Sequence, residues 1–104
     1  MKVATKGRCY ELAFRFLLEQ QEGELVHGSV ETDSRRIDHA WVELPTGYVY
    51  EPENEIFFPL AFFKKALKPK EDNRYNLEQA ARMAVRTGNY GWWTEQERER
   101  WLTK

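Results

Sequence analysis

The sequence contains a single cysteine, Cys9, among 104 residues. One cysteine cannot form an internal disulfide, and a free thiol suits a reducing compartment, so we expect a cytoplasmic protein. Long apolar runs are missing as well. The longest one, "IFFPLAFF" at 56–63, is far shorter than the roughly 20 residues that cross a bilayer. The start "MKVATKGRCY" lacks the apolar core of a signal peptide, so we expect no membrane partner.

An excess of one charge is also missing. Lysine and arginine together number 16, and aspartate and glutamate number 17. Nucleic acid is therefore not an expected partner, although "SRRIDHAW" and "KKALKPK" are locally basic. The composition, with 41% hydrophobic and 14% aromatic residues, is that of a folded protein. The length predicts one domain over residues 1–104 and leaves the oligomeric state open.

The first half of the chain predicts a helix followed by strands. Apolar residues recur at helical spacing over 9–21, and this places Cys9 in the first turn, on the stripe that faces the core. Alternating patterns then predict strands at 24–31, 39–44 and 48–52. The polar stretch 32–38 is predicted to be a loop.

The second half is predicted to be helical. Start and stop signals indicate helices at 59–67, at 76–88 and from 94 onward. The charged stretch 64–74 is expected to be a solvated loop. This order of elements predicts an α+β fold, in which an N-terminal helix packs on a small antiparallel sheet with additional C-terminal helices.

The turn between the second and third predicted strands fixes which side chains share a face. A three-residue loop at 45–47, "PTG", fits a type I turn with a bulge, because proline and glycine stand at the positions that this turn requires. In the resulting register His39 lies opposite Glu53, and Glu51 becomes its diagonal neighbour on the same face. A two-residue loop would move Glu51 to the other face.

Cys9, His39 and Glu51 are together the residue types of a thiol-based catalytic unit. The free amides and the dipole at a helix start stabilise a thiolate, and a neighbouring imidazolium adds to this. An imidazole can move protons to and from the reacting groups, and a third group must hold its tautomer. The amide of Cys9 is also a candidate oxyanion donor.

The motifs "CYELA", "HAWVEL" and "VYEP" resemble the transglutaminase-like and papain-like cysteine peptidase superfamily, in particular its small bacterial and phage members. The resemblance covers residues 7–53 and implies a minimal papain-like/transglutaminase-like fold. It implies that Cys9 is the nucleophile, His39 the general base and acid, and Glu51 the orienting acid, with no metal and no cofactor. The implied substrate is a peptide, a protein or another amide. In the superfamily the acid is usually aspartate, and here it is glutamate.

Three aromatic residues are candidates for substrate binding. Trp41 shares the face of His39 on the predicted strand, and Tyr90 and Trp92 belong to "NYGWW" at 89–93. An aromatic wall beside a Cys9 cleft would favour an acyl or peptide substrate. The alternative for 89–93 is a cap that closes the core of the small domain.

Other functions remain open on the sequence alone. The same fold without activity would be an interaction module, and cysteine, histidine and glutamate can also bind zinc, although only three ligands are evident. Glu53 is a second candidate for orienting His39. His27 has no matching context and is interpreted as a histidine whose hydrogen bonds are satisfied within a strand.

Overall fold

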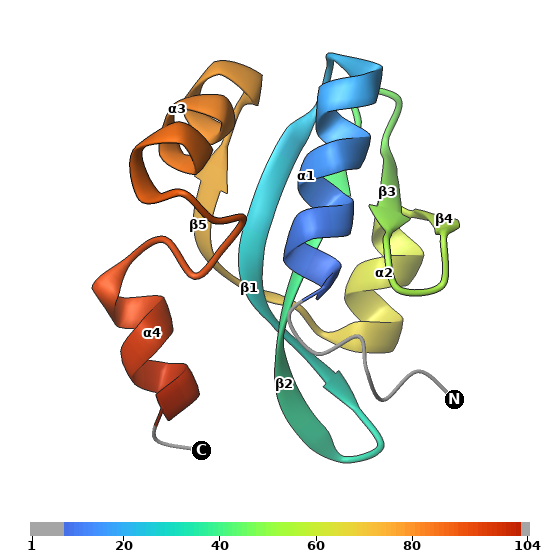
Figure 1. The fold of residues 1–104 in the computed structure, drawn as a ribbon. Helices are drawn as coiled ribbons and strands as arrows, with labels where there is room; N and C mark the ends of the chain where they lie inside the picture. The colour runs from blue at the N-terminus through green and yellow to red at the C-terminus, as the bar shows by residue number, and fades with distance from the viewer. Residues whose placement is uncertain (1–7, 103–104) are drawn as a thin grey trace.

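The computed structural model describes the backbone of residues 8–102 and the side chains of residues 8–99. Four helices and five strands follow one another in the described chain (Figure 1). In chain order they are α1 (Arg8–Gln20), β1 (Glu24–Thr32), β2 (Arg35–Glu43), β3 (Tyr48–Glu51), β4 (Ile56–Pro59), α2 (Leu60–Leu67), β5 (Lys70–Tyr75), α3 (Leu77–Thr87) and α4 (Glu95–Leu102). The predicted α+β class is confirmed, with the N-terminal helix on an antiparallel sheet and further helices after it.

The five strands form one antiparallel sheet in the order β4-β3-β2-β1-β5. Helix α1 covers one face, where Ala13 and Leu17 pack with Leu25, Ala40 and Val42. Figure 1 shows α1 in front of β1 and β2, with α2 on the far side of the sheet.

The second face of the sheet carries its own apolar cluster. Here Phe63 of α2 packs against Val26, Val30, Trp41 and Val49. Because side chains alternate along β1 and β2, neighbouring residues of one strand enter different clusters. The sheet is therefore buried on both sides, and each face has a helix of its own.

The loop predicted at 32–38 is wrong except at Asp33 and Ser34. Strands β1 and β2 form one long hairpin in which Thr32 pairs with Arg35, so the loop has only two residues. Asp33 and Ser34 form it with φ values of 49° and 64°, the positive φ that a two-residue hairpin turn demands. The polar composition misled the prediction, because hydrogen bonds between strand backbones do not need apolar side chains.

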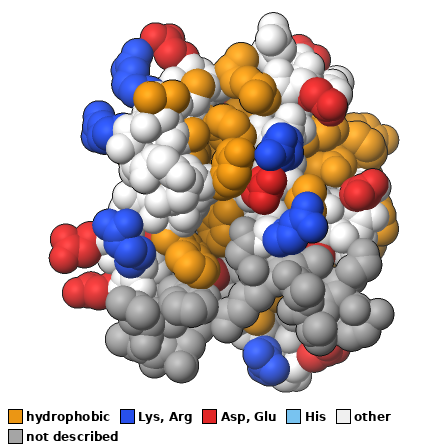
Figure 2. Space-filling model, viewed as in Figure 1, with side chains coloured by type: hydrophobic (Ala, Val, Ile, Leu, Met, Phe, Trp, Pro, Cys, Tyr) orange, Lys and Arg blue, Asp and Glu red, His pale blue; other side chains and the backbone are white. Residues whose placement is uncertain are grey.

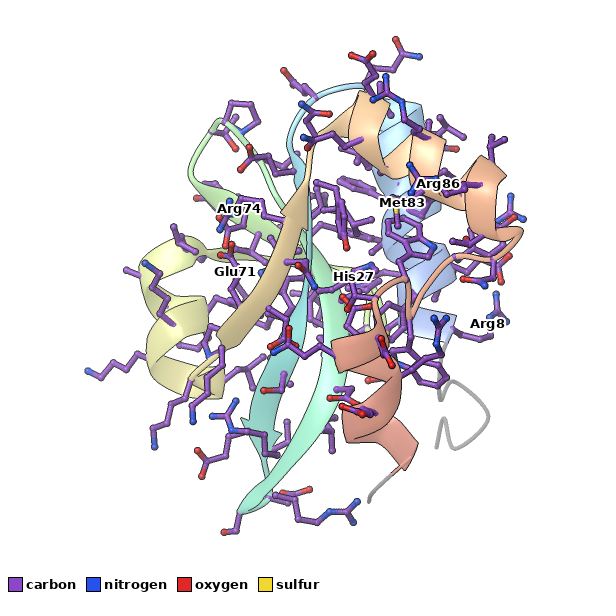
Figure 3. The ribbon with its side chains drawn as sticks, turned by 90° about the vertical axis from the view of Figure 1, so that its left-hand side faces the viewer. Arg8, His27, Glu71, Arg74, Met83 and Arg86 are labelled. Atoms are coloured by element: carbon purple, nitrogen blue, oxygen red, sulfur yellow. The ribbon has the colours of Figure 1, made fainter. Side chains whose placement is uncertain are left out.

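The solvated loop predicted at 64–74 is also wrong. Its first part completes α2, and its last part is β5, which pairs with the edge of β1. Arg74 of β5 forms ion pairs with Glu24, Glu43 and Glu71, at 2.6, 2.9 and 2.7 Å. Figure 3 shows Arg74 and Glu71 on this outer strand. Because the side chains of this edge strand are mostly charged, its sequence lacks the alternating apolar pattern that usually indicates a strand.

Apolar side chains gather in two places on the face of the described residues that Figure 2 shows. Figure 2 shows hydrophobic side chains gathered along the boundary between α1 and α3, and a second group beside β4. Ile56 and Phe57 of β4 are 42% and 50% exposed. Among the described residues, no helix has the length and apolar character to cross a membrane.

Candidate functional site

Cys9 is the second residue of α1, and its side chain is 5% exposed. It is a free cysteine in the apolar cluster beneath α1, as its place on the core-facing stripe predicts. The first turn of a helix carries amide groups without intrahelical acceptors, so the thiol lies at the positive end of the helix dipole.

The turn after β2 has the predicted conformation. The amide of Gly47 donates to the carbonyl of Leu44 over 3.0 Å, and the amide of Leu44 donates to Tyr48 over 2.8 Å. Gly47 has a φ of 92°, the left-handed value that the bulge position requires. The pairing of Val42 with Tyr50 belongs to the same register, so the three-residue loop is confirmed.

This register brings His39 and Glu51 into direct contact. The Nε2 of His39 lies 2.7 Å from Glu51 Oε2. Because an ionised carboxylate only accepts hydrogen bonds, Nε2 is the donor and carries a proton. The two residues are 3% and 4% exposed, so the pair is shielded from water.

The carboxylate of Glu51 is itself held in place by three further donors. The amide of Glu53 donates to Oε2 over 3.2 Å, and both the amide and the Nδ2 of Asn54 donate to Oε1 over 3.0 Å. Burial raises the pKa of Glu51, but the bonds from His39, Asn54 and Glu53 outweigh burial and leave that pKa below its ordinary value. The group is therefore a fixed anion.

The side chain of Cys9 also interacts with His39. Since Glu51 occupies Nε2, the nitrogen that remains for the hydrogen bond with the Cys9 side chain is Nδ1. Burial alone lowers the pKa of His39, but the hydrogen bonds and negative charges of Cys9 and Glu51 outweigh it and raise the pKa to about 10. The imidazole is thus a cation at neutral pH, between two acidic partners.

The two residues meet although they come from different sides of the sheet. Cys9 belongs to the cluster under α1, whereas His39 alternates with Ala40 and shares the other face with Trp41. Within the described register β3 pairs with β2 only at Val42 and Glu43. His39 pairs with Gly28 of β1 on one side of β2, and on the β3 side no strand of the described residues pairs with it.

Glu53 lies close to this pair, and the carboxylate whose hydrogen bond to His39 the structure shows is that of Glu51. Ligand atoms of His39, Glu51 and Glu53 lie within 4.8 Å of one another, so these three residues could together approach a metal ion. Cys9 is not in this group, and the predicted zinc alternative would exchange the thiol for Glu53. Both oxygens of Glu51 already accept hydrogen bonds, and a metal would have to displace those donors.

The three aromatic candidates lie in different surroundings. Trp41 is 1% exposed and contacts Phe63 at 5.3 Å between ring centroids, which makes it a core residue beside His39. Tyr90 and Trp92 are half-buried and pack against the α1 cluster, with Trp92 5.7 Å from Tyr10. Segment 89–93 thus caps the core next to Tyr10, the neighbour of Cys9.

The sequence did not indicate a second buried pair, His27 with Glu97. His27 Nδ1 lies 3.2 and 3.3 Å from the two oxygens of Glu97, and both residues are nearly inaccessible, at 0% and 1%. Figure 3 shows His27 inside the molecule, behind β5. The only sequence signal was the capping pattern of Thr94 and Glu97. The amide of Glu97 donates to Thr94 Oγ1 as that pattern predicts, whereas the Glu97 carboxylate accepts from the amide of Trp93 and contacts His27.

Comparison with protein-family models, with characterised proteins and with solved structures found no match. Interpretation of the site therefore depends on its own geometry and on the resemblance of its motifs.

Proposed function

We propose that this protein is a thiol-dependent acyl-transfer enzyme that acts on an amide or peptide bond. The observation that carries the proposal is the position of His39, which donates to Glu51 from Nε2 and also interacts with the side chain of Cys9. A thiol, an imidazole and an orienting acid in this order have complementary roles in nucleophilic catalysis. The resemblance to transglutaminase-like and papain-like enzymes agrees with these roles.

In the first step the Cys9 thiolate attacks the carbonyl carbon of the substrate, and an S–C bond forms. His39 gives its Nδ1 proton to the nitrogen of the leaving amine, the C–N bond breaks, and a thioester remains on Cys9. Water or a second amine then attacks the thioester, His39 takes the proton of that nucleophile, and the thiolate is released. Glu51 keeps the Nε2 proton in place throughout and so fixes the ring orientation.

The reaction also requires a donor to the oxyanion and a thiol that stays reduced. The Cys9 amide at the start of α1 is a candidate donor to the oxyanion that forms on the carbonyl oxygen. No metal or cofactor enters either step. A reactive thiol must remain reduced, and we propose a cytoplasmic setting for the reaction.

The proposal predicts high reactivity of Cys9 at acid pH. A small alkylating reagent such as iodoacetamide should modify the thiol at mildly acidic pH, where an ordinary cysteine with a pKa of about 8.5 is almost fully protonated. His39→Ala should reduce that low-pH rate at least tenfold, because it removes the cation beside the sulfur. Mass spectrometry of the Cys9 peptide measures both rates.

A denatured sample of each protein gives the reference rate of the exposed thiol. An alkylation profile that follows an ordinary thiol in both proteins would contradict the proposal. It would favour the alternative of an inactive interaction module with the same fold.

A further inference from the structure

An apolar pocket lies on the α2 side of the sheet and begins at the candidate site. Its volume is about 170 Å³, many times what one buried water needs. Its walls come from β2, β4 and α2, with Ile37, Phe58, Phe62, Phe63 and Leu67 among the lining residues. Phe62 at its rim is 52% exposed, so a ligand can reach the pocket from solvent.

The polar end of the pocket is formed by the candidate site itself. His39, Glu51, Glu53 and Asn54 line it, and Cys9 does not. The pocket therefore approaches the imidazole from the carboxylate side, whereas Cys9, which interacts with His39, belongs to the apolar cluster under α1. The two sides of His39 face different halves of any substrate that reacts at the thiol.

The chemistry of acyl transfer determines where the acyl half and the amine half of the substrate lie. The acyl carbon of the substrate must bond to sulfur, so the acyl half lies with Cys9. The nitrogen that leaves must accept its proton from His39, and an incoming amine must give its proton to the same ring. A substituent of that nitrogen that extends past His39, away from the sulfur, enters the pocket that His39 lines.

We propose that this pocket binds the apolar substituent of the amine half of the substrate, which is the leaving amine in cleavage and the incoming amine in transfer. This inference rests on the proposed acyl-transfer function. Apolar walls favour a hydrocarbon chain or ring over a polar one. At the polar end the cation of His39 is paired with Glu51, so the second carboxylate, Glu53, leaves a net negative charge that favours an ammonium group over an anion of the same length.

The transfer step balances without any further reactant. The neutral amine attacks the thioester carbon, an N–C bond forms, and the S–C bond breaks. The proton of the amine passes through His39, and the products are an amide and the original pair of Cys9 and His39. In cleavage the same atoms move in the reverse order up to the thioester, and water completes the cycle.

The test separates this inference from the proposed function. Cys9 is first acetylated with p-nitrophenyl acetate, and mass spectrometry verifies a single acetyl group on its peptide. The thioester then reacts with water or with an added primary amine at mildly alkaline pH. The rates of reaction with ethylamine and with n-hexylamine are compared. We expect n-hexylamine to react at least tenfold faster, since each buried methylene favours binding severalfold. The acetyl thioester of N-acetylcysteine, which has no pocket, gives the intrinsic ratio.

Two exposed alanines of α2 provide matched variants. Ala66 lines the pocket and Ala61 does not, so Ala66→Phe should abolish the preference for n-hexylamine while Ala61→Phe keeps it. Acetylation of Cys9 without a chain-length preference, or equal behaviour of the two variants, would overturn the pocket assignment and leave the proposed function intact. Failure of Cys9 to accept the acetyl group would overturn both.

Binding can be measured without any reaction. In Cys9→Ser, NMR titration with n-hexylammonium should shift the signals of Phe63 and Leu67, and hexanoate should bind at least tenfold more weakly. Equal or stronger binding of hexanoate would contradict the assignment of the pocket to an amine, and an absence of shifts with both probes would contradict the pocket as a ligand site.

Discussion

His27 and Glu97, seventy residues apart, form a buried imidazole–carboxylate pair on the opposite face of the sheet from His39 and Glu51. In both pairs a histidine from the central strands contacts a glutamate from a later segment. Their surroundings differ. His39 adjoins a thiol and a pocket, whereas the ring of His27 lies among aromatic rings, 4.7 Å from Tyr10 and 4.9 Å from Trp93.

We infer that the second pair is structural and holds α4 against the sheet. Glu97 also accepts hydrogen bonds from Asn73 Nδ2 at 2.9 Å and from the amide of Trp93 at 2.8 Å. One carboxylate thereby joins β1, β5 and the segment before α4. The candidate site at His39 and the anchor of the C-terminal helix use the same two residue types in different surroundings.

Replacement of Glu97 should therefore destabilise the protein without altering the candidate site of Cys9, His39 and Glu51. We expect Glu97→Gln to lower the free energy of unfolding by about 2 kcal/mol, because buried donors lose a charged acceptor. Glu95→Gln, on an exposed position of the same helix, should have an effect within about 0.5 kcal/mol. Urea unfolding followed by tryptophan fluorescence measures both, and equal effects would contradict the anchoring role.

The carboxylate of Glu97 should also make the free energy of unfolding decrease at acid pH. Burial raises the pKa of Glu97, but hydrogen bonds from His27, Asn73 and Trp93 outweigh it and leave the pKa lowered. A lowered folded pKa contributes stability above the unfolded value, and this contribution is lost as the pH falls through the folded value. Between pH 5 and pH 3, stability should fall less steeply in Glu97→Gln than in the wild type, as urea unfolding at each pH would reveal.

The orienting role of Glu51 can be separated from that of Glu53. Glu51→Gln should reduce the low-pH alkylation rate of Cys9 at least tenfold, because the amide no longer supplies the charge that holds His39 as a cation. Glu53→Gln should change that rate less than threefold, since the backbone amide of residue 53, which donates to Glu51, is retained. Circular dichroism verifies that each variant is folded. A larger effect from Glu53→Gln would assign the orienting role to that residue.

Alkaline pH should weaken the fold through His39. Its folded pKa of about 10 lies above the ordinary value of 6.5, so its contribution is complete below 6.5 and is lost as the pH rises through about 10. The slope is at most about 1.4 kcal/mol per pH unit for one proton. It should be clearest above pH ~8.5, where the thiols of unfolded chains are already ionised. His39→Gln should remove this slope from a series of urea titrations, and an unchanged slope would contradict the charged pair.

Gly28 is required by the contact between β1 and β5. A Cβ at this position would lie 2.0 Å from the carbonyl oxygen of Lys70, where the register of the two strands shifts. Gly28→Ala should therefore cost about 2 kcal/mol or more in unfolding free energy. Gly88→Ala is the control, because a Cβ there meets no atom within 4 Å and only its φ of 75° is unfavourable, at about 1 kcal/mol. Thermal unfolding compares the two, and equal losses would mean that the strands adjust freely.

A metal should not be needed for thiol reactivity. The three groups near a possible metal position, His39, Glu51 and Glu53, include a carboxylate whose oxygens are both engaged by hydrogen bonds. We expect elemental analysis of purified protein to find far less than one zinc per chain, and EDTA to leave the alkylation rate of Cys9 unchanged. Stoichiometric zinc, with a rate that rises on its removal, would favour the metal-binding alternative.

The local parts of this molecule could be predicted from the sequence. The helix that starts near Cys9 follows from apolar spacing, and the register between β2 and β3 follows from the turn at 45–47. That register alone places Glu51 beside His39, because side chains alternate strictly and a turn of known length leaves one arrangement. Such features depend on residues close together in the chain, whose geometry the backbone fixes.

The other features of the fold and of the candidate site depend on the tertiary structure and could not be predicted from the sequence. The pairing of β5 with β1 depends on backbone groups, which polar side chains such as those at 70–74 conceal. The pair of His27 and Glu97 joins elements seventy residues apart, and no local pattern encodes that contact. Trp41 lies in the core because α2 covers its face of the sheet, and the pocket beside His39 is formed between residues of the same helix and residues of the strands. These features arise where distant segments pack together, and packing depends on the shapes of both surfaces at once.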